Sequence, residues 1–208
     1  MQLTLVYPNF PFWRAEVSRI ALHLGGIQFE NRHFTREEFR AAKADGTLPF
    51  GQVPILIVDG ETIAQTGAIA RFCGKLSGLY PTDDALSAAK IDQFIDACTD
   101  VTGRVGLTMG IKDPEEKMAA RAALAADTLP KWLGYLEALS PPETGGFFVG
   151  DSLTIADVAV WRLMGWLTGG ILDGVPATVV DPFPRLKAHA ERTGAEPRIR
   201  AWMDANYG

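Results

Sequence analysis

Apolar positions in the first eighty residues follow two different periods. Short stretches that are continuously apolar or alternate with polar residues predict four strands, at residues 3–7, 27–34, 53–58 and 61–64. Helical spacing predicts helices at residues 14–24 and 65–76, and the charged stretch 35–46 predicts a short helix and loop. Asp59-Gly60 predicts a hairpin turn between the last two strands. The order β-α-β, loop, β-β-α favours a four-stranded mixed sheet with helices on its faces.

The pattern changes near residue 80, where the strand signals cease. Helical periodicity then predicts helices over residues 87–109, 114–139, 154–167, 183–190 and 197–206. We therefore expect an α/β domain over residues 1–80, followed by an all-helical domain over residues 85–208. A chain of 208 residues is long enough for two such domains.

Composition and charge argue against several classes of function. Apolar residues make up 47% of the chain, and the formal net charge is -5, so we expect neither nucleic acid nor a membrane surface as a partner. No uninterrupted apolar stretch reaches the roughly 18 residues that a membrane span requires. The N-terminus also lacks the basic region of a signal peptide. We expect a cytoplasmic protein.

The cysteines and histidines read as structural residues. Cys73 and Cys98 lie inside apolar, helix-periodic stretches, which predicts buried, reduced thiols. His23, His33 and His189 have no partners at metal-ligand spacing. We therefore expect no bound metal.

Pro54, at the entry to the third predicted strand, is the first of three features that suggest chemistry. Proline is the residue that readily takes a cis peptide bond, and it cannot donate to a strand ladder. A cis bond here would turn the N–H and C=O of Val53 outward, where they could pair with an extended, peptide-like ligand. An edge-strand proline with no binding role is the alternative.

Two polar positions complete the set. Gln65 and Thr66 stand at the start of a predicted helix, where free N–H groups and the helix dipole suit a carboxylate, although simple capping is an alternative. Tyr7 ends the first predicted strand and could donate a hydrogen bond to a thiolate, although a lone tyrosine is more often a packing residue. Lowering a thiol pKa by about two units requires roughly 2.7 kcal/mol of differential stabilisation.

Taken in order, these motifs resemble the cytosolic glutathione transferases, and specifically their sigma-like branch. The segment Pro49-Phe50-Gly51-Gln52-Val53-Pro54 and the segment Gln65-Thr66-Gly67-Ala68-Ile69-Ala70 match in the first half. In the second half, Gly150-Asp151-Ser152-Leu153-Thr154-Ile155-Ala156-Asp157 matches and contains a capping-box-like helix start. The resemblance covers nearly the whole chain and implies a thioredoxin-like first domain.

The resemblance also implies roles for individual residues. Tyr7 would stabilise the glutathione thiolate, and Val53, before a cis Pro54, would pair with the cysteinyl backbone. Gln65 and Thr66 would hold the γ-glutamyl carboxylate. The remaining glutathione-binding candidates are Arg14, Phe39, Lys43, Gln52 and, from the partner subunit of a homodimer, Asp100. Glutathione would be the co-substrate.

Three positions depart from the family pattern. Phe39 stands where a tryptophan is usual, and two extra residues lie between Lys43 and Pro49. The loop 10–16 replaces a shorter one, so that Tyr7 lies one residue further than usual from Arg14.

The second substrate is expected to be a small, apolar electrophile bound between the Tyr7 loop and the helical domain. Its predicted wall consists of Phe10, Trp13, Arg104, Val105, Thr108 and Met109. Trp202 and Tyr207 are candidates for closing this site from the C-terminus. Ordinary core packing is the alternative for each of these residues.

Several functions share the predicted site. Conjugation of glutathione to an electrophile is the leading hypothesis. A glutathione-dependent isomerase, as in prostaglandin D synthases of the resembled branch, or a peroxidase of the same fold would use the same thiolate. A non-catalytic relative, either a structural lens-type protein or a ligand carrier, is the alternative from a different class.

Overall fold

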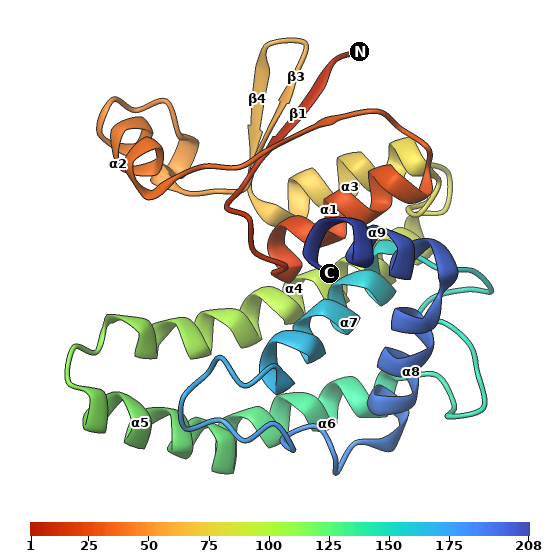
Figure 1. The fold of residues 1–208 in the computed structure, drawn as a ribbon. Coiled ribbons are helices and arrows are strands. Elements are labelled where there is room, and N and C mark those ends of the chain that lie inside the picture. The colour runs from red at the N-terminus through yellow and green to blue at the C-terminus, as the bar shows by residue number, and fades with distance from the viewer.

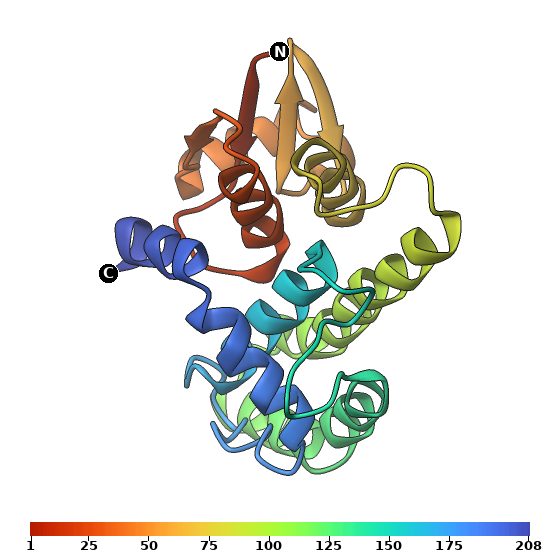
Figure 2. The same cartoon turned by 90° about the vertical axis from the view of Figure 1, so that its right-hand side faces the viewer.

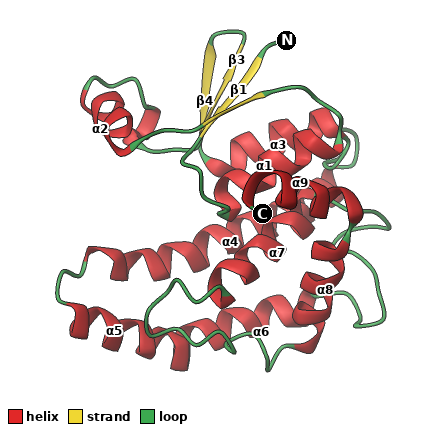
Figure 3. Ribbon diagram, in the orientation of Figure 1, coloured by secondary structure: helices red, strands yellow, loops and turns green.

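The computed structural model describes residues 1–208, and its first part is built on one four-stranded sheet. The strands are β1 (Leu3–Val6), β2 (Glu30–Arg32), β3 (Ile55–Val58) and β4 (Glu61–Ala64). Their order across the sheet is β2-β1-β3-β4, with β2 parallel to β1 and the other pairs antiparallel. The predicted mixed sheet is confirmed (Figure 3, strands in yellow).

Two details of the sheet have local causes. Asp59 and Gly60 both have positive φ, 49° and 92°, as a tight turn between antiparallel strands requires, and the predicted hairpin is confirmed. The second strand is shorter than the predicted 27–34, because β2 is an edge strand that pairs only with β1. Ile27 and Phe29 instead pack against the core from the segment before it.

Three helices flank the sheet. Helices α1 (Trp13–Leu24) and α3 (Thr66–Ser77) pack against each other and cover the face that looks toward the helical half, as Figures 1 and 2 show. Helix α2 (Arg36–Ala44) stands apart on the other side of the sheet. A capping box starts α2, in which Thr35 accepts from the Glu38 N–H and Glu38 accepts from the Thr35 N–H.

The second half of the chain is entirely helical. Its α-helices are α4 (Ala85–Gly106), α5 (Pro114–Ala123), α6 (Leu129–Leu139), α7 (Ile155–Thr168), α8 (Pro184–Ala195) and α9 (Pro197–Tyr207). A 3-10 turn, η2 (Leu107–Gly110), follows α4. No helix of the chain is both long enough and apolar enough to cross a membrane.

The helix predicted over residues 114–139 is confirmed, although it is not a regular α-helix throughout. A π-helical segment, η3 (Leu124–Thr128), separates α5 from α6. Pro130 lies two residues after this segment. Proline has no N–H to donate, and its ring would clash with the carbonyl four residues earlier in a regular α-helix. The wider π turn accommodates that proline.

One hydrophobic core runs through both halves of the molecule. A single cluster of 41 buried residues contains Leu5 of the sheet, Ile20 of α1 and Leu163 of α7. Helix α7 packs against α1, and the Ile155 N–H donates to the carbonyl of Leu79, which lies just after α3. Cys73 and Cys98 belong to this core as free thiols, which confirms their predicted burial. The sheet and the helical half are therefore packed as one body.

Candidate active site

A shallow depression lies where α1, α3 and the start of β3 converge. Its lining residues are Arg14, Pro49, Phe50, Gln52, Val53, Pro54, Ala64, Gln65 and Thr66. Most of the glutathione-binding candidates from the sequence are therefore brought together. Pro49 and Phe50 belong to the short 3-10 turn η1 (Pro49–Gly51), in which Phe50 has a positive φ of 60°.

Val53 and Pro54 form one wall of the depression. Their peptide bond is cis, as Pro54 at a strand entry predicted. Neither the N–H nor the C=O of Val53 has a hydrogen-bond partner within the chain, although the adjacent Ile55 pairs with Val6 and Ala64. An extended ligand could therefore pair with the Val53 backbone as an added strand does.

The N-terminus of α3 forms the opposite wall. Gln65 precedes the helix with a φ of 74°, and its side chain makes no capping hydrogen bond. Thr66 is buried, and its hydroxyl oxygen accepts a hydrogen bond from Arg14 Nη1 at 3.5 Å. The first N–H groups of α3 and the Arg14 guanidinium create a positive site suited to a carboxylate. The partly buried Arg14 guanidinium has a lowered pKa, chiefly because of its desolvation.

Tyr7 follows β1 directly, and its position is fixed from two sides. Its N–H donates to the carbonyl of Arg32 at 3.1 Å, and the Arg19 guanidinium lies 5.7 Å from the centre of its ring. Burial raises the pKa of the Tyr7 hydroxyl to about 12, and the positive charges of Arg14 and Arg19 oppose this only in part. The hydroxyl therefore keeps its proton near neutral pH and is able to donate a hydrogen bond.

Three glutathione-binding candidates lie outside the depression. Phe39 packs against the small core of Val6, Leu48 and Ile55 beneath α2. The aliphatic part of Lys43 lies over Gly51, where its Cε is 3.3 Å from the position that a Cβ would take. Asp100 is exposed on α4, and its carboxylate lies 3.9 Å from Arg104 of the next turn.

The structure corrects three of the six electrophile-site candidates. Trp13 and Val105 are completely buried, and Trp13 Nε1 donates to Thr102 at 2.8 Å. Thr108 is buried too, and its hydroxyl donates to the Val105 carbonyl and accepts from Arg121 Nε. All three side chains are buried in the packing of the chain, so they offer no accessible wall.

The other three electrophile candidates remain accessible. Phe10 is 38% exposed and Met109 is 50% exposed. Arg104 is partly exposed, with its guanidinium 4.2 Å from the centre of the Trp132 ring. None of these residues lines one of the five main cavities.

The C-terminal aromatic residues do not close a site near Tyr7 in the expected way. Trp202 stacks near His23 and Phe29, with ring centres 5.2 Å and 5.9 Å away. The Tyr207 hydroxyl points into α1, where it contacts Glu16 and Arg19.

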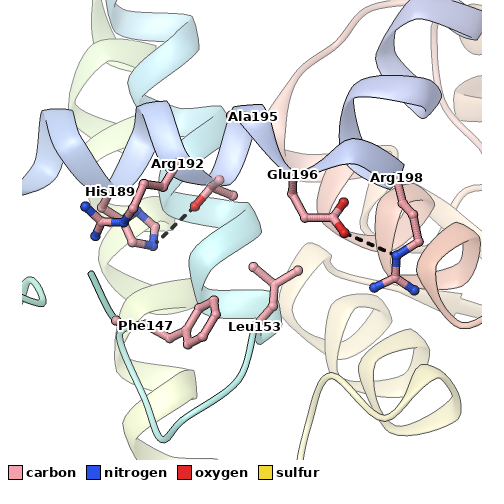
Figure 4. A pocket seen from close by; sticks show the side chains of 9 residues that line it. Phe147, Leu153, His189, Arg192, Ala195, Glu196 and Arg198 are labelled. Atoms are coloured by element: carbon pink, nitrogen blue, oxygen red, sulfur yellow. Dashed lines mark hydrogen bonds and ion pairs between the residues drawn. The ribbon is translucent and has the colours of Figure 1, made fainter. Parts of the chain in front are cut away.

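The largest of the five main cavities, about 540 Å³, lies away from these residues (Figure 4). It opens between α8 and the loop that carries Phe147 and Leu153. Its polar wall includes His189, which the sequence predicted to be structural and whose Nε2 lies 2.9 Å from Asp157 Oδ1. This cavity shares no lining residue with the depression that holds the glutathione-binding candidates.

The sequence did not predict three of the residues that line the depression. Pro49 and Phe50 were part of the matched motif but had no assigned role, and Ala64 was only a strand residue. Phe50 could have been identified from its position in a loop between the charged stretch 35–46 and the strand that Pro54 precedes. A large apolar side chain in such a loop often contacts a ligand or a partner.

Two family models match this chain. The model described as "Glutathione S-transferase, N-terminal domain" matches residues 1–74, and "Glutathione S-transferase, C-terminal domain" matches residues 100–206. The chain belongs to the glutathione S-transferase family. It is a glutathione transferase, with glutathione as its co-substrate.

Relatives of the glutathione S-transferase family cover almost the entire chain. Probable glutathione S-transferase 5 of Caenorhabditis elegans is 33% identical over 192 residues, which is 91% of this chain and 89% of the relative. A solved C. elegans glutathione S-transferase has a TM-score of 0.81 at 31% identity, covering 100% of this chain and 98% of that one. Prostaglandin synthase D of Nilaparvata lugens has a TM-score of 0.84 at 26% identity, covering 98% of each chain.

Proposed function

We propose that this transferase conjugates the glutathione thiolate to small, apolar electrophiles, with Tyr7 as the catalytic hydrogen-bond donor. The observation that carries the proposal is the depression in which the Val53 backbone, the N-terminus of α3 and Arg14 converge, with Arg14 close enough to Tyr7 for its charge to act on the pKa of that hydroxyl. A protonated hydroxyl can stabilise a thiolate without being consumed, and the reaction then needs proximity rather than a covalent enzyme intermediate. Arg14 adds a positive charge on the same side.

The glutathione contacts follow from the depression. In this proposal the Val53 backbone pairs with the cysteinyl part, and Gln65, Thr66 and the α3 N-terminus hold the γ-glutamyl carboxylate. Gln52 would contact the glycyl end, together with Phe39 and with Lys43, whose side chain lies over Gly51 beside the depression. We assign residues 1–80 to glutathione binding and residues 85–208 to the electrophile.

The apolar nature of the electrophile is supported by side chains that remain open to water. Phe10 follows the catalytic strand, while Leu107 and Met109 follow α4 with 81% and 50% exposure. Such exposed apolar side chains favour an apolar ligand. The likeness to a prostaglandin synthase D favours glutathione-dependent isomerisation as the second candidate and is consistent with a sigma-like branch. Peroxidase activity would use the same thiolate. We place the enzyme in the cytoplasm.

The decisive experiment is a glutathione titration followed by thiolate absorbance, on the wild type and on Tyr7→Phe. A saturable thiolate signal near neutral pH is expected for the wild type, with a loss of roughly tenfold or more in the thiolate fraction for Tyr7→Phe. Tyr135→Phe is the matched control, because Tyr135 is 63% exposed and lies in α6. Binding of glutathione without a thiolate signal would instead favour a ligand carrier.

A further inference from the structure

Helix α1 carries an ion pair that is withdrawn completely from water. Glu16 and Arg19 are both 0% exposed, and Arg19 Nη1 lies 2.8 Å from Glu16 Oε1. The two residues are three apart on one helix, a spacing that on a surface helix would read as an ordinary exposed pair. Burying both charges is costly unless the remaining donors and acceptors find partners.

Helix α9 supplies those partners from the other end of the chain. The Tyr207 hydroxyl donates to Glu16 Oε1 at 2.7 Å and accepts from Arg19 Nη1 at 2.8 Å. Trp202 Nε1 donates to the second carboxylate oxygen, Glu16 Oε2, at 3.0 Å. A further partner of Arg19 comes from the sheet, where Asn31 Oδ1 accepts from Nε at 2.8 Å.

The same arginine contacts the catalytic strand end. Arg19 Nη2 donates to the carbonyl of Pro8, the residue after Tyr7, at 3.4 Å. Its guanidinium also lies 5.7 Å from the centre of the Tyr7 ring. One planar group therefore contacts Tyr207 on one side and the Tyr7-Pro8 segment on the other.

The Tyr207 hydroxyl is the contact that holds this guanidinium in place from α9. Without it, Arg19 Nη1 retains only Glu16, and Glu16 Oε1 loses a donor in a site that water does not reach. The guanidinium would then relax toward the carboxylate and away from the Pro8 carbonyl, whose hydrogen bond is already long. Other charges near the Tyr7 hydroxyl are those of Arg14 and Glu16, and Arg162 of α7 binds the Pro11 carbonyl of the same loop.

We propose that Tyr207 is a positioning residue for the thiolate site: its hydroxyl fixes Arg19, and Arg19 fixes the direction of the Tyr7 hydroxyl. This inference rests on the proposed role of Tyr7. Its consequence is that the last turn of the chain, which does not line the glutathione depression, sets how strongly the enzyme stabilises the thiolate.

The test compares Tyr207→Phe with the wild type in the full chain, by thiolate absorbance of bound glutathione across pH. Tyr207→Phe keeps the ring and should leave the dissociation constant of glutathione within about twofold. The apparent pKa of the bound thiol should rise by about half a unit to one unit, which corresponds to a threefold to tenfold smaller thiolate fraction near neutral pH. A fall of similar size is expected in kcat, with KM for glutathione almost unchanged.

Trp202→Phe is the second variant, because it removes a donor to Glu16 that does not touch Arg19. It should lower the melting temperature and leave the thiol pKa at the wild-type value. The inference is overturned if Tyr207→Phe lowers stability but keeps the wild-type thiol pKa, or if both variants shift that pKa equally. A wild type that binds glutathione without forming thiolate would overturn the proposed function itself, which distinguishes the two failures.

Discussion

Burial sets the protonation of the aromatic and thiol groups closest to the proposed site. Desolvation raises the pKa of Tyr7 from its ordinary value to about 12, and it raises the pKa of Cys73 in α3 to about 12 as well. The pKa of Cys98 in α4 is also raised by burial. The protonated Tyr7 hydroxyl can donate a hydrogen bond, whereas the two protonated thiols are unreactive as nucleophiles. Glutathione would therefore supply the reactive thiol at this site.

We expect neither Cys73 nor Cys98 to react with iodoacetamide at neutral pH while the protein is folded. Only thiolates are alkylated quickly, and both thiols are buried and protonated. Mass spectrometry after timed labelling should show an unmodified native chain and two modifications after unfolding in urea. Rapid labelling of the native protein at either cysteine would contradict this assignment.

Among the elements, α7 depends most on a single buried carboxylate. Asp157 accepts hydrogen bonds from the Thr154 N–H and hydroxyl at 2.8 Å each and from the Phe148 N–H at 2.9 Å. His189 of α8 is its fourth partner, at 2.9 Å. The predicted capping-box start of this helix is confirmed, and the same carboxylate also ties a loop and a second helix to it.

Asp157→Asn should reduce the free energy of unfolding by about 2–4 kcal/mol, because an amide nitrogen would face buried donors that now meet a carboxylate. Urea unfolding followed by circular dichroism measures this loss. Asp113→Asn is the matched control: Asp113 is an exposed N-cap of α5, where asparagine caps as well as aspartate, so a change within about 0.5 kcal/mol is expected. Equal losses of unfolding free energy in the two variants would show that the buried partners of Asp157 do not stabilise the fold.

At the scale of the whole molecule, the two halves share one core, but the site stays open on one side. Phe50 lies at the rim of the depression and is 75% exposed. Asp100 on α4, proposed to reach the ligand of a neighbouring subunit, is also exposed and does not line the depression of its own chain. An exposed phenylalanine beside a site that a second chain could complete supports a symmetric dimer.

We therefore expect light scattering to give about twice the 22.6 kDa mass of one chain. Phe50→Asp should shift the population toward the single chain, because a carboxylate would be buried at the interface. Ile171→Asp is the control, since Ile171 is 52% exposed in the segment after α7. A single-chain mass for the wild type would refute the dimer. That state does occur in a similar structure: a glutathione S-transferase of the hookworm Necator americanus, at 27% identity and a TM-score of 0.79, is described as monomeric.

Local patterns in the sequence determined most of the elements and the centre of the site. Alternation and helical spacing predicted the strands, the hairpin at Asp59-Gly60 and most helices, because each depends on the geometry of one short segment. Pro54 and Gln65-Thr66 could be identified for the same reason: a strand entry and a helix start are local features, and the sheet then brings them together.

Tertiary structure alone decided which faces are buried. Trp13 and Val105 were expected to line a site, but the packing of α1 and α4 withdraws them from water. Glu16 and Arg19 have no local signal for burial, and their pairing is completed by Tyr207 from the far end of the chain. Periodicity records the preferences of one segment, whereas burial and hydrogen-bond satisfaction depend on which distant segment packs against it.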